Sequence, residues 1–202
     1  MGLDQVSKGS LDTLRKGWIP TAILLPGIAF EVVGSAARSA LRFDRTAIVD
    51  HEYWRLVSGH FVHLGWTHLA LNGVGLVLVS LLVGRNFSAT QWLVIAVVAI
   101  AGIDGGLWYL DPDLAWYVGL SGLLHGLLAA GLLPGLVEGN VESRILGILL
   151  ASKIAWEQFF GSMPGSAELA GGDVVTNAHL YGVVSGVVAA AVVIGVGWRR
   201  PI

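Results

Sequence analysis

The sequence lacks cysteine and is poor in charge. None of its 202 residues is cysteine, and only 13% are Asp, Glu, Lys or Arg. Without cysteine the chain can form no disulfide, no thiolate metal site and no cysteine nucleophile. The few charges belong to a chain that is 54% hydrophobic, with a mean hydropathy of +0.71. Its uncharged apolar stretches are long enough to cross a bilayer, so the composition predicts a membrane protein with several spans.

Two further features are missing, and each absence argues against a class of function. The net charge is only -2, and no basic patch suggests nucleic-acid binding. No internal repeat is visible, which argues against a transporter built from two related halves. At this length the predicted spans fill one bundle and leave no room for a sizeable soluble domain.

Apolar runs separated by polar segments predict six membrane-spanning helices. Each must be helical, because backbone groups in lipid have to be hydrogen-bonded within their own segment. The fold class is therefore an all-α membrane protein with a six-helix bundle over residues 18–198, flanked by short segments at residues 1–17 and 199–202. The predicted spans are Trp18 to Ala36, Gly65 to Gly84, Gln91 to Leu110, Gly119 to Leu136, Arg144 to Phe160, and a stretch within Val174 to Trp198.

Six spans place both termini on the same side of the membrane. Positive residues concentrate in cytoplasmic loops, and their distribution here favours cytoplasmic termini. The terminal side would hold seven of them, Lys8, Arg15, Lys16, Arg85, Arg144, Arg199 and Arg200, and the opposite side four, Arg38, Arg42, Arg45 and Arg55. On this topology the second, fourth and sixth spans begin near the outer face. His68, Ser121 and His179 are therefore expected at similar depth.

The polar residues at these helix starts are suited to acyl transfer. Polar side chains in membrane helices are costly and usually face the bundle interior. Ser121 is a weak nucleophile until a base such as His179 takes its proton. His68 and Asn72 lie four positions apart and so share a helix face. Together with the Ser121 backbone N–H, they could donate hydrogen bonds to a developing oxyanion.

Small residues recur at three- or four-residue spacing on the fourth and sixth spans. Such spacing lets two membrane helices approach closely, which a Ser–His hydrogen bond between them requires. Glycines spaced in this way also serve packing alone, with no catalytic site nearby. The residues are Gly119, Gly122 and Gly126 on one span, and Ala178, Gly182 and Gly186 on the other.

Four short motifs occur in a fixed order along the predicted spans. They are Trp54-Arg55 in the first loop, His68 with Asn72 on the second span, GLSG at Gly119 to Gly122, and AHLYGVVSG at Ala178 to Gly186. This pattern resembles that of the rhomboid intramembrane serine proteases. The resemblance implies a Ser121–His179 dyad without a third, acidic member. It also implies oxyanion donors at His68, Asn72 and the Ser121 backbone, and we expect no cofactor and no metal.

Longer stretches point to one subfamily. GHFVHLGWTHLALN, YVGLSGLLHGLLAAG, SKIAWEQ and AHLYG are similar to rhombosortases, whereas the opening HEYWR departs slightly from a GEYWR-like opening. The resemblance implies a compact six-helix protease of the bacterial inner membrane, with its active site toward the periplasm. It also implies membrane-protein substrates of the GlyGly-CTERM type, whose C-terminal tails contain a Gly-Gly motif, one membrane helix and a basic end.

Three further polar residues on the spans are secondary candidates. His125 shares a helix face with Ser121, and we expect it to make a structural hydrogen bond or shape the pocket rather than act as the base. Lys153 and Glu157 form an i,i+4 pair inside the fifth span. A buried ion pair is expensive unless both charges are satisfied. The pair either neutralises itself or helps to dock substrate, since the fifth helix is the proposed lateral gate of rhomboids.

Other polar and aromatic residues have two interpretations each. Arg55 either braces the first loop or binds lipid phosphate. Tyr181 could line the cavity, since rhomboids place an aromatic ring near this position against the catalytic histidine. His60 and His63 precede the second span and suggest a metal cluster, but their spacing is irregular and no nearby acid completes a site. We expect both to form hydrogen bonds within the loop.

Alternative functions remain open at this point. A rhomboid-like protein without activity could bind and escort membrane clients, although such proteins typically lack the serine or the histidine that this chain has. A small transporter would explain the polar residues in the spans but not the four motifs. For a protease, the acyl-enzyme could be released by water or by an amine, which would make the enzyme a transpeptidase.

Overall fold

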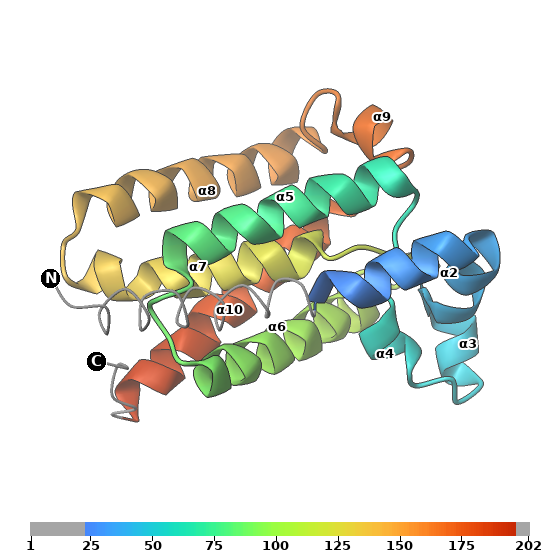
Figure 1. Ribbon diagram of the computed structural model, residues 1–202, viewed down its shortest axis with the longest axis horizontal. Helices are drawn as coiled ribbons and strands as arrows, with labels where there is room; N and C mark the ends of the chain where they lie inside the picture. Colours follow the sequence, from blue (N-terminus) through green and yellow to red (C-terminus); the bar gives the residue numbers. More distant parts are fainter. Residues whose placement is uncertain (1–22, 197–202) are drawn as a thin grey trace, which may run out of the picture.

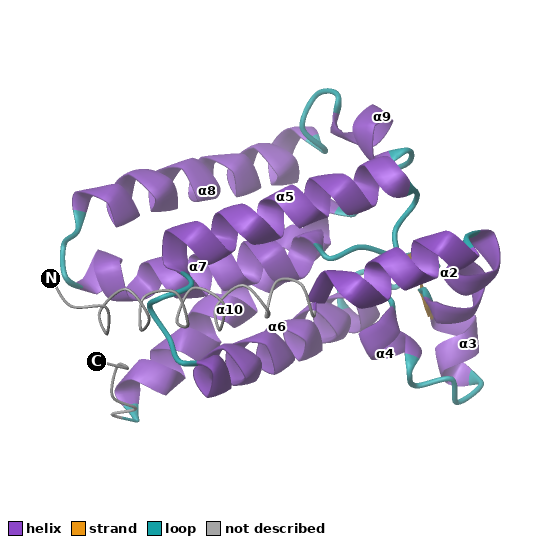
Figure 2. Ribbon diagram, viewed as in Figure 1, coloured by secondary structure: helices purple, strands orange, loops and turns teal. Residues whose placement is uncertain are grey.

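The apolar runs form helices in the computed structural model, which describes residues 23–196 (Figures 1 and 2). The predicted segments 1–17 and 199–202, the start of the first span and the end of the sixth lie outside the described residues. The chain is mostly helical, as predicted. The helices at the predicted spans are Ile23–Val33, α5 (Trp66–Val83), α6 (Ala89–Tyr109), α7 (Ser121–Val137), α8 (Val141–Phe160) and α10 (Thr176–Gly195).

Three of these helices, α5, α6 and α10, are long and apolar enough to cross a membrane. Helices Ile23–Val33 and α7 are apolar but shorter. Helix α8 has 20 residues, but four of them are charged, namely Glu142, Arg144, Lys153 and Glu157. Length and composition therefore identify three spans within residues 23–196, and the total of six remains a prediction.

Two helices begin a few residues before the predicted spans because side chains cap them. Helix α6 begins at Ala89, where the Ser88 hydroxyl accepts from the backbone N–H of Gln91. The Gln91 side chain accepts in return from the Ser88 N–H at 2.7 Å. Helix α8 begins after Asn140, whose side chain accepts from the Ser143 N–H at 2.9 Å. Each cap satisfies backbone donors that the first turn of a helix leaves free.

Short elements occupy one end of the bundle (Figure 1). Before α5 the chain forms α2 (Ser35–Leu41), β1 (Phe43–Asp44), α3 (Arg45–Val49) and α4 (Arg55–Ser58), and α9 (Ser166–Ala170) precedes α10. Strand β1 pairs antiparallel with β2 (Trp116–Tyr117), which lies just before α7. This pairing corrects the all-α prediction in one detail. It also ties the first loop to the segment that leads into α7.

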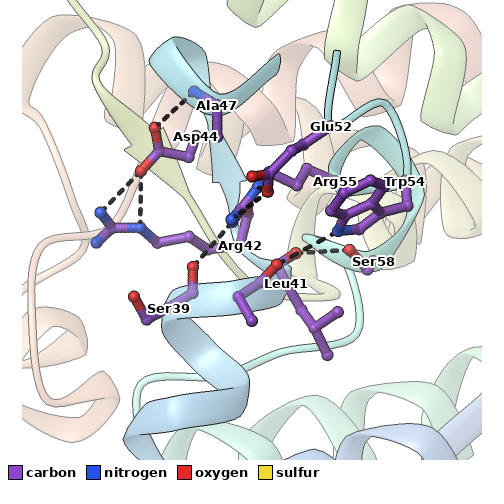
Figure 3. Close-up of polar contacts among 10 residues, drawn as sticks. Ser39, Leu41, Arg42, Asp44, Ala47, Glu52, Trp54, Arg55 and Ser58 are labelled. Atoms are coloured by element: carbon purple, nitrogen blue, oxygen red, sulfur yellow. Dashed lines mark hydrogen bonds and ion pairs between the residues drawn. The ribbon is translucent and has the colours of Figure 1, made fainter. Parts of the chain in front are cut away.

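Arg55 braces this end of the bundle, and Figure 3 shows its partners. Its guanidinium donates to the carbonyls of Ser39 and Arg42 at 2.8 and 3.1 Å, at the end of α2. It also forms an ion pair with Glu52 at 2.6 Å. Arg55 is buried, so these groups replace water around the charge. Of the two interpretations of Arg55, the structure supports the brace rather than a contact with lipid phosphate.

A second arginine joins the first loop to α6. Helices end with carbonyls that have no partner inside the helix. The Arg45 guanidinium donates to the carbonyls of Leu107 and Trp108 in the last turn of α6, and to those of Asp111 and Leu114 just beyond it. The same guanidinium lies 4.6 Å from the centre of the Trp108 ring. Arg45 thus fixes the first loop on the end of α6.

Helices α7 and α10 form the most extensive helix contact in the described chain. Glycines line this contact, because the backbones of the two helices approach so closely that no side chain fits between them. A β-carbon on Gly126 would lie 2.6 Å from the carbonyl oxygen of Gly182, and one on Gly182 would collide with the carbonyl of Gly122. A β-carbon on Gly186 would likewise collide with the carbonyl of Gly126. Glycine contacts of this kind allow close helix packing in membranes.

We expect Gly182→Ala to destabilise the protein, because the added methyl group must push α10 away from α7. Overpacking of this kind costs about 1–3 kcal/mol. Gly105→Ala is the matched control, since a β-carbon on Gly105 of α6 would meet no atom within 4 Å. Thermal unfolding of both variants in the same detergent would measure the difference. Equal melting temperatures for Gly182→Ala and Gly105→Ala would contradict the tight contact.

Candidate active site

The N-terminal ends of α5, α7 and α10 lie at the end of the bundle that carries the short helices (Figure 1). Ser121 is the first residue of α7, and His179 lies one turn into α10. The Ser121 Oγ is 2.9 Å from the Nε2 of His179. The close packing of α7 against α10 places the two side chains at the distance that a serine nucleophile and its base require.

A carboxylate from α8 occupies the other side of His179. The Nδ1 of His179 is 2.9 Å from Glu157 Oε2, and both side chains are buried. The second carboxylate oxygen of Glu157 accepts from the Lys153 ammonium at 2.6 Å. The resemblance implied no acidic third member, so the contact between Glu157 and His179 was not predicted. Glu157 stood out in the sequence only as the partner of Lys153.

His125 lies against both members of the candidate dyad. Its Nδ1–H donates to the Ser121 carbonyl at 2.7 Å, across one turn of α7. Its ring stacks on that of His179, with the centroids 4.2 Å apart and the planes 19° from parallel. Tyr181, which lies two residues after His179 and could line the cavity, places its ring against Gly106 of α6. The stacking partner of His179 is therefore His125.

His68 and Asn72 approach the same region from α5. The His68 ring lies against Gly119, where a β-carbon would be 2.9 Å from its Cε1. Gly119 has a φ of +117° and faces His68, rather than lying in the α7–α10 contact to which its spacing had assigned it. The Leu64 N–H donates to His68 Nδ1 at 3.4 Å, which leaves the His68 proton on Nε2. Asn72 is buried and donates to the His68 carbonyl at 3.2 Å.

Tyr117 supports the backbone just before Ser121. Its hydroxyl donates to the Gly119 carbonyl at 2.6 Å, and its side chain is buried. Burial raises the pKa of the Tyr117 phenol, so the hydroxyl keeps the proton that it donates. Tyr117 was not among the predicted site residues. Its position two residues before Gly119 is the only signal that the sequence offers.

His60 is held from α6 rather than from its own loop. Its Nε2 is 3.1 Å from Asp104 Oδ1, and its ring meets that of Tyr117 edge to face at 5.5 Å. The expectation that His60 would form its hydrogen bond within the loop was therefore wrong, because its partner Asp104 belongs to α6. Among residues 23–196, no three His, Asp or Glu side chains are grouped so that they could hold a metal ion.

Comparison with known proteins identifies a family to which this chain is similar. A family model of the Rhomboid domain matches residues 50–196, which include every residue of the candidate site described above. A comparison with curated proteins finds no match. Rhomboids are a family of intramembrane proteases that act on transmembrane substrates, although some rhomboid-like members are inactive. Because the match spans most of its length, this multi-pass membrane protein belongs to the rhomboid family.

Proposed function

We propose that this protein is an intramembrane serine endopeptidase with Ser121 as nucleophile and His179 as general base. The observation that carries the proposal is the 2.9 Å contact between Ser121 Oγ and His179 Nε2. Both side chains belong to helices in close contact, so little reorganisation is needed before reaction. The presence of both residues favours a protease over a non-catalytic protein that binds membrane clients.

The proposed reaction proceeds in two steps. Ser121 Oγ attacks the scissile carbonyl carbon while His179 Nε2 accepts the hydroxyl proton. The tetrahedral intermediate collapses, the C–N bond breaks, and His179 returns the proton to the leaving amine. Water then attacks the resulting ester with His179 again as base. This step releases the acid and restores the serine hydroxyl.

The oxyanion of the intermediate needs fixed donors, and three groups could supply them. His68 carries its proton on Nε2, which lies against Gly119 beside the nucleophile. The Ser121 N–H belongs to the first turn of α7 and has no partner within that helix. The Asn72 amide has a second hydrogen besides the one that it donates to His68. Such donors stabilise charge that develops only during the reaction.

We place the protein in the bacterial inner membrane with six spans, both termini in the cytoplasm and the active site toward the periplasm. The substrate would be a single-span protein whose helix enters between α5 and α8. Helix α8 packs against α7 and α10 but has little contact with α5, which favours this entrance. Gly-Gly near the cleavage site would ease unwinding, because each glycine in a helix costs about 1 kcal/mol relative to alanine. These properties are those of a rhombosortase acting on GlyGly-CTERM tails.

The dyad predicts selective loss of covalent labelling. A fluorophosphonate should label the purified protein, and Ser121→Ala and His179→Ala should lower the labelling rate by at least about 10³-fold, since either removes the activated nucleophile. His125→Phe should keep measurable labelling, because it retains a ring against His179. Melting temperatures check that each variant is folded.

Labelling of Ser121→Ala would show that another residue reacts. A folded wild type that is neither labelled nor able to cleave would favour client binding.

The substrate proposal is tested with a matched pair of membrane-anchored reporters in proteoliposomes. One reporter carries Gly-Gly before a single helix and a basic tail, and in the other Leu-Leu replaces Gly-Gly. We expect the first to be cleaved at least about 10-fold faster, because leucine favours the helix that must unwind. Equal rates for reporters that insert equally would contradict Gly-Gly recognition. The mass of the released product distinguishes hydrolysis from transfer to an added amine.

A further inference from the structure

We propose that Glu157 is a positioning residue that holds His179 in the tautomer able to accept the Ser121 proton. The inference rests on the proposed function of Ser121 and His179 and extends the dyad to a third member supplied by α8. The family pattern in the sequence contains no such member. The proposal rests on two distances on opposite sides of one imidazole ring, 2.9 Å to Ser121 Oγ and 2.9 Å to Glu157 Oε2.

These two contacts determine where the proton of His179 lies. An ionised carboxylate can only accept hydrogen bonds, so the Nδ1 that faces Glu157 must carry the hydrogen. A neutral imidazole has one hydrogen, so Nε2 is left as an acceptor. The Ser121 hydroxyl is the group that faces Nε2. The carboxylate therefore selects the tautomer that a general base needs, and it also stabilises the imidazolium that forms when the proton is transferred.

Both carboxylate oxygens of Glu157 accept hydrogen bonds, which argues that Glu157 does more than neutralise Lys153. Glu157 accepts from Lys153 with Oε1 and from His179 with Oε2. Lys153 alone would satisfy the charge and does not require contact with α10. The Lys153 side chain is 34% exposed, whereas that of Glu157 is 2% exposed, so the carboxylate turns into the bundle and toward His179. Lys153 then offsets the cost of keeping a carboxylate there.

Other polar groups around His179 do not replace this contact. His125 stacks on the face of the ring and uses its own Nδ1 on the Ser121 carbonyl. His68 lies against Gly119. A ring held only by stacking and by the serine could present either nitrogen to Ser121. Glu157 is thus the group in the described contacts that distinguishes one imidazole nitrogen from the other.

Glu157→Gln tests the proposal because glutamine has a single side-chain oxygen. The charged Lys153 is the stronger donor and takes that oxygen, which turns the amide NH₂ toward His179. Nδ1 must then accept, and the proton moves to Nε2, where it blocks transfer from Ser121. We expect kcat to fall about 10²- to 10⁴-fold, as when a catalytic histidine takes the wrong tautomer, with KM little changed. Glu142→Gln, an exposed change on the same helix, should leave kcat unchanged.

The double variant Lys153→Met, Glu157→Gln separates positioning from a structural role. Without Lys153, the glutamine oxygen is free to accept from His179 Nδ1–H and restores the productive tautomer. We expect the double variant to cleave at least about 10-fold faster than Glu157→Gln alone, since one correctly placed acceptor is regained. A residue needed only for folding would show the opposite order, because the double variant loses an additional polar contact.

Nitrogen NMR of histidine-labelled protein reads the tautomer directly, with His179→Gln used to assign the signals. We expect the proton of His179 on Nδ1 in the wild type, on Nε2 in Glu157→Gln, and again on Nδ1 in the double variant. Melting temperatures of all variants show that they are folded.

Each other outcome overturns a defined part of the proposal. Full activity of folded Glu157→Gln, or an inactive double variant that is folded and no better than the single one, would overturn positioning by Glu157. An unchanged His179 tautomer in Glu157→Gln would do the same. All of these results leave the dyad intact when Ser121→Ala and His179→Ala abolish labelling of an active wild type. If the wild type is itself neither labelled nor active, the proposed function fails instead.

Discussion

The close approach of α7 and α10 is the constraint on which the rest of the site depends. Ser121 and His179 lie on different helices, 58 positions apart, and their contact is only as short as the helix separation allows. Glycine carries no side chain, so Gly126 and Gly182 let backbone meet backbone below the dyad. The conformational cost of these glycines in water is offset in a bundle by the packing that they allow. Packing and chemistry are therefore set by the same residues.

The loops at the end of the bundle that carries the short helices fix the starts of the helices that carry the candidate site. Arg45 and Arg55 bind backbone carbonyls rather than ligands, and they join the first loop to α6 and α2. Strand β1 pairs with β2, which places Tyr117 beneath the Gly119 carbonyl. This chain of contacts holds the backbone just before Ser121. The basic first loop thus holds the proposed nucleophile in place, even though none of its arginines contacts Ser121.

Sequence patterns predicted the helices and the grouping of Ser121, His179, His68 and Asn72, because hydropathy and motif order carry that information.

Sequence patterns did not predict contacts that depend on helix rotation or on backbone partners. Whether Glu157 points toward His179 depends on the rotation of α8 about its own axis. An i,i+4 pair such as Lys153 and Glu157 can form on any face of a helix, so its spacing does not reveal that rotation. The partners of Arg45 are carbonyls, which every residue offers. Helices α6 and α8 begin earlier than predicted, because their capping residues Ser88 and Asn140 lie outside the apolar runs.

In the proposed function, helix α8 would combine two roles that place opposite demands on it. It would border the substrate entrance, where its contact with α5 is small, and it carries the carboxylate that meets His179. Movement of α8 away from α10 would separate Glu157 from His179. Lys153 would leave with Glu157, since both lie on α8, so the departing pair stays neutral and the movement is less costly in lipid. The histidine would then lose its fixed tautomer until α8 returned. The proposed geometry thus couples the orientation of the base to closure of the helix beside the substrate.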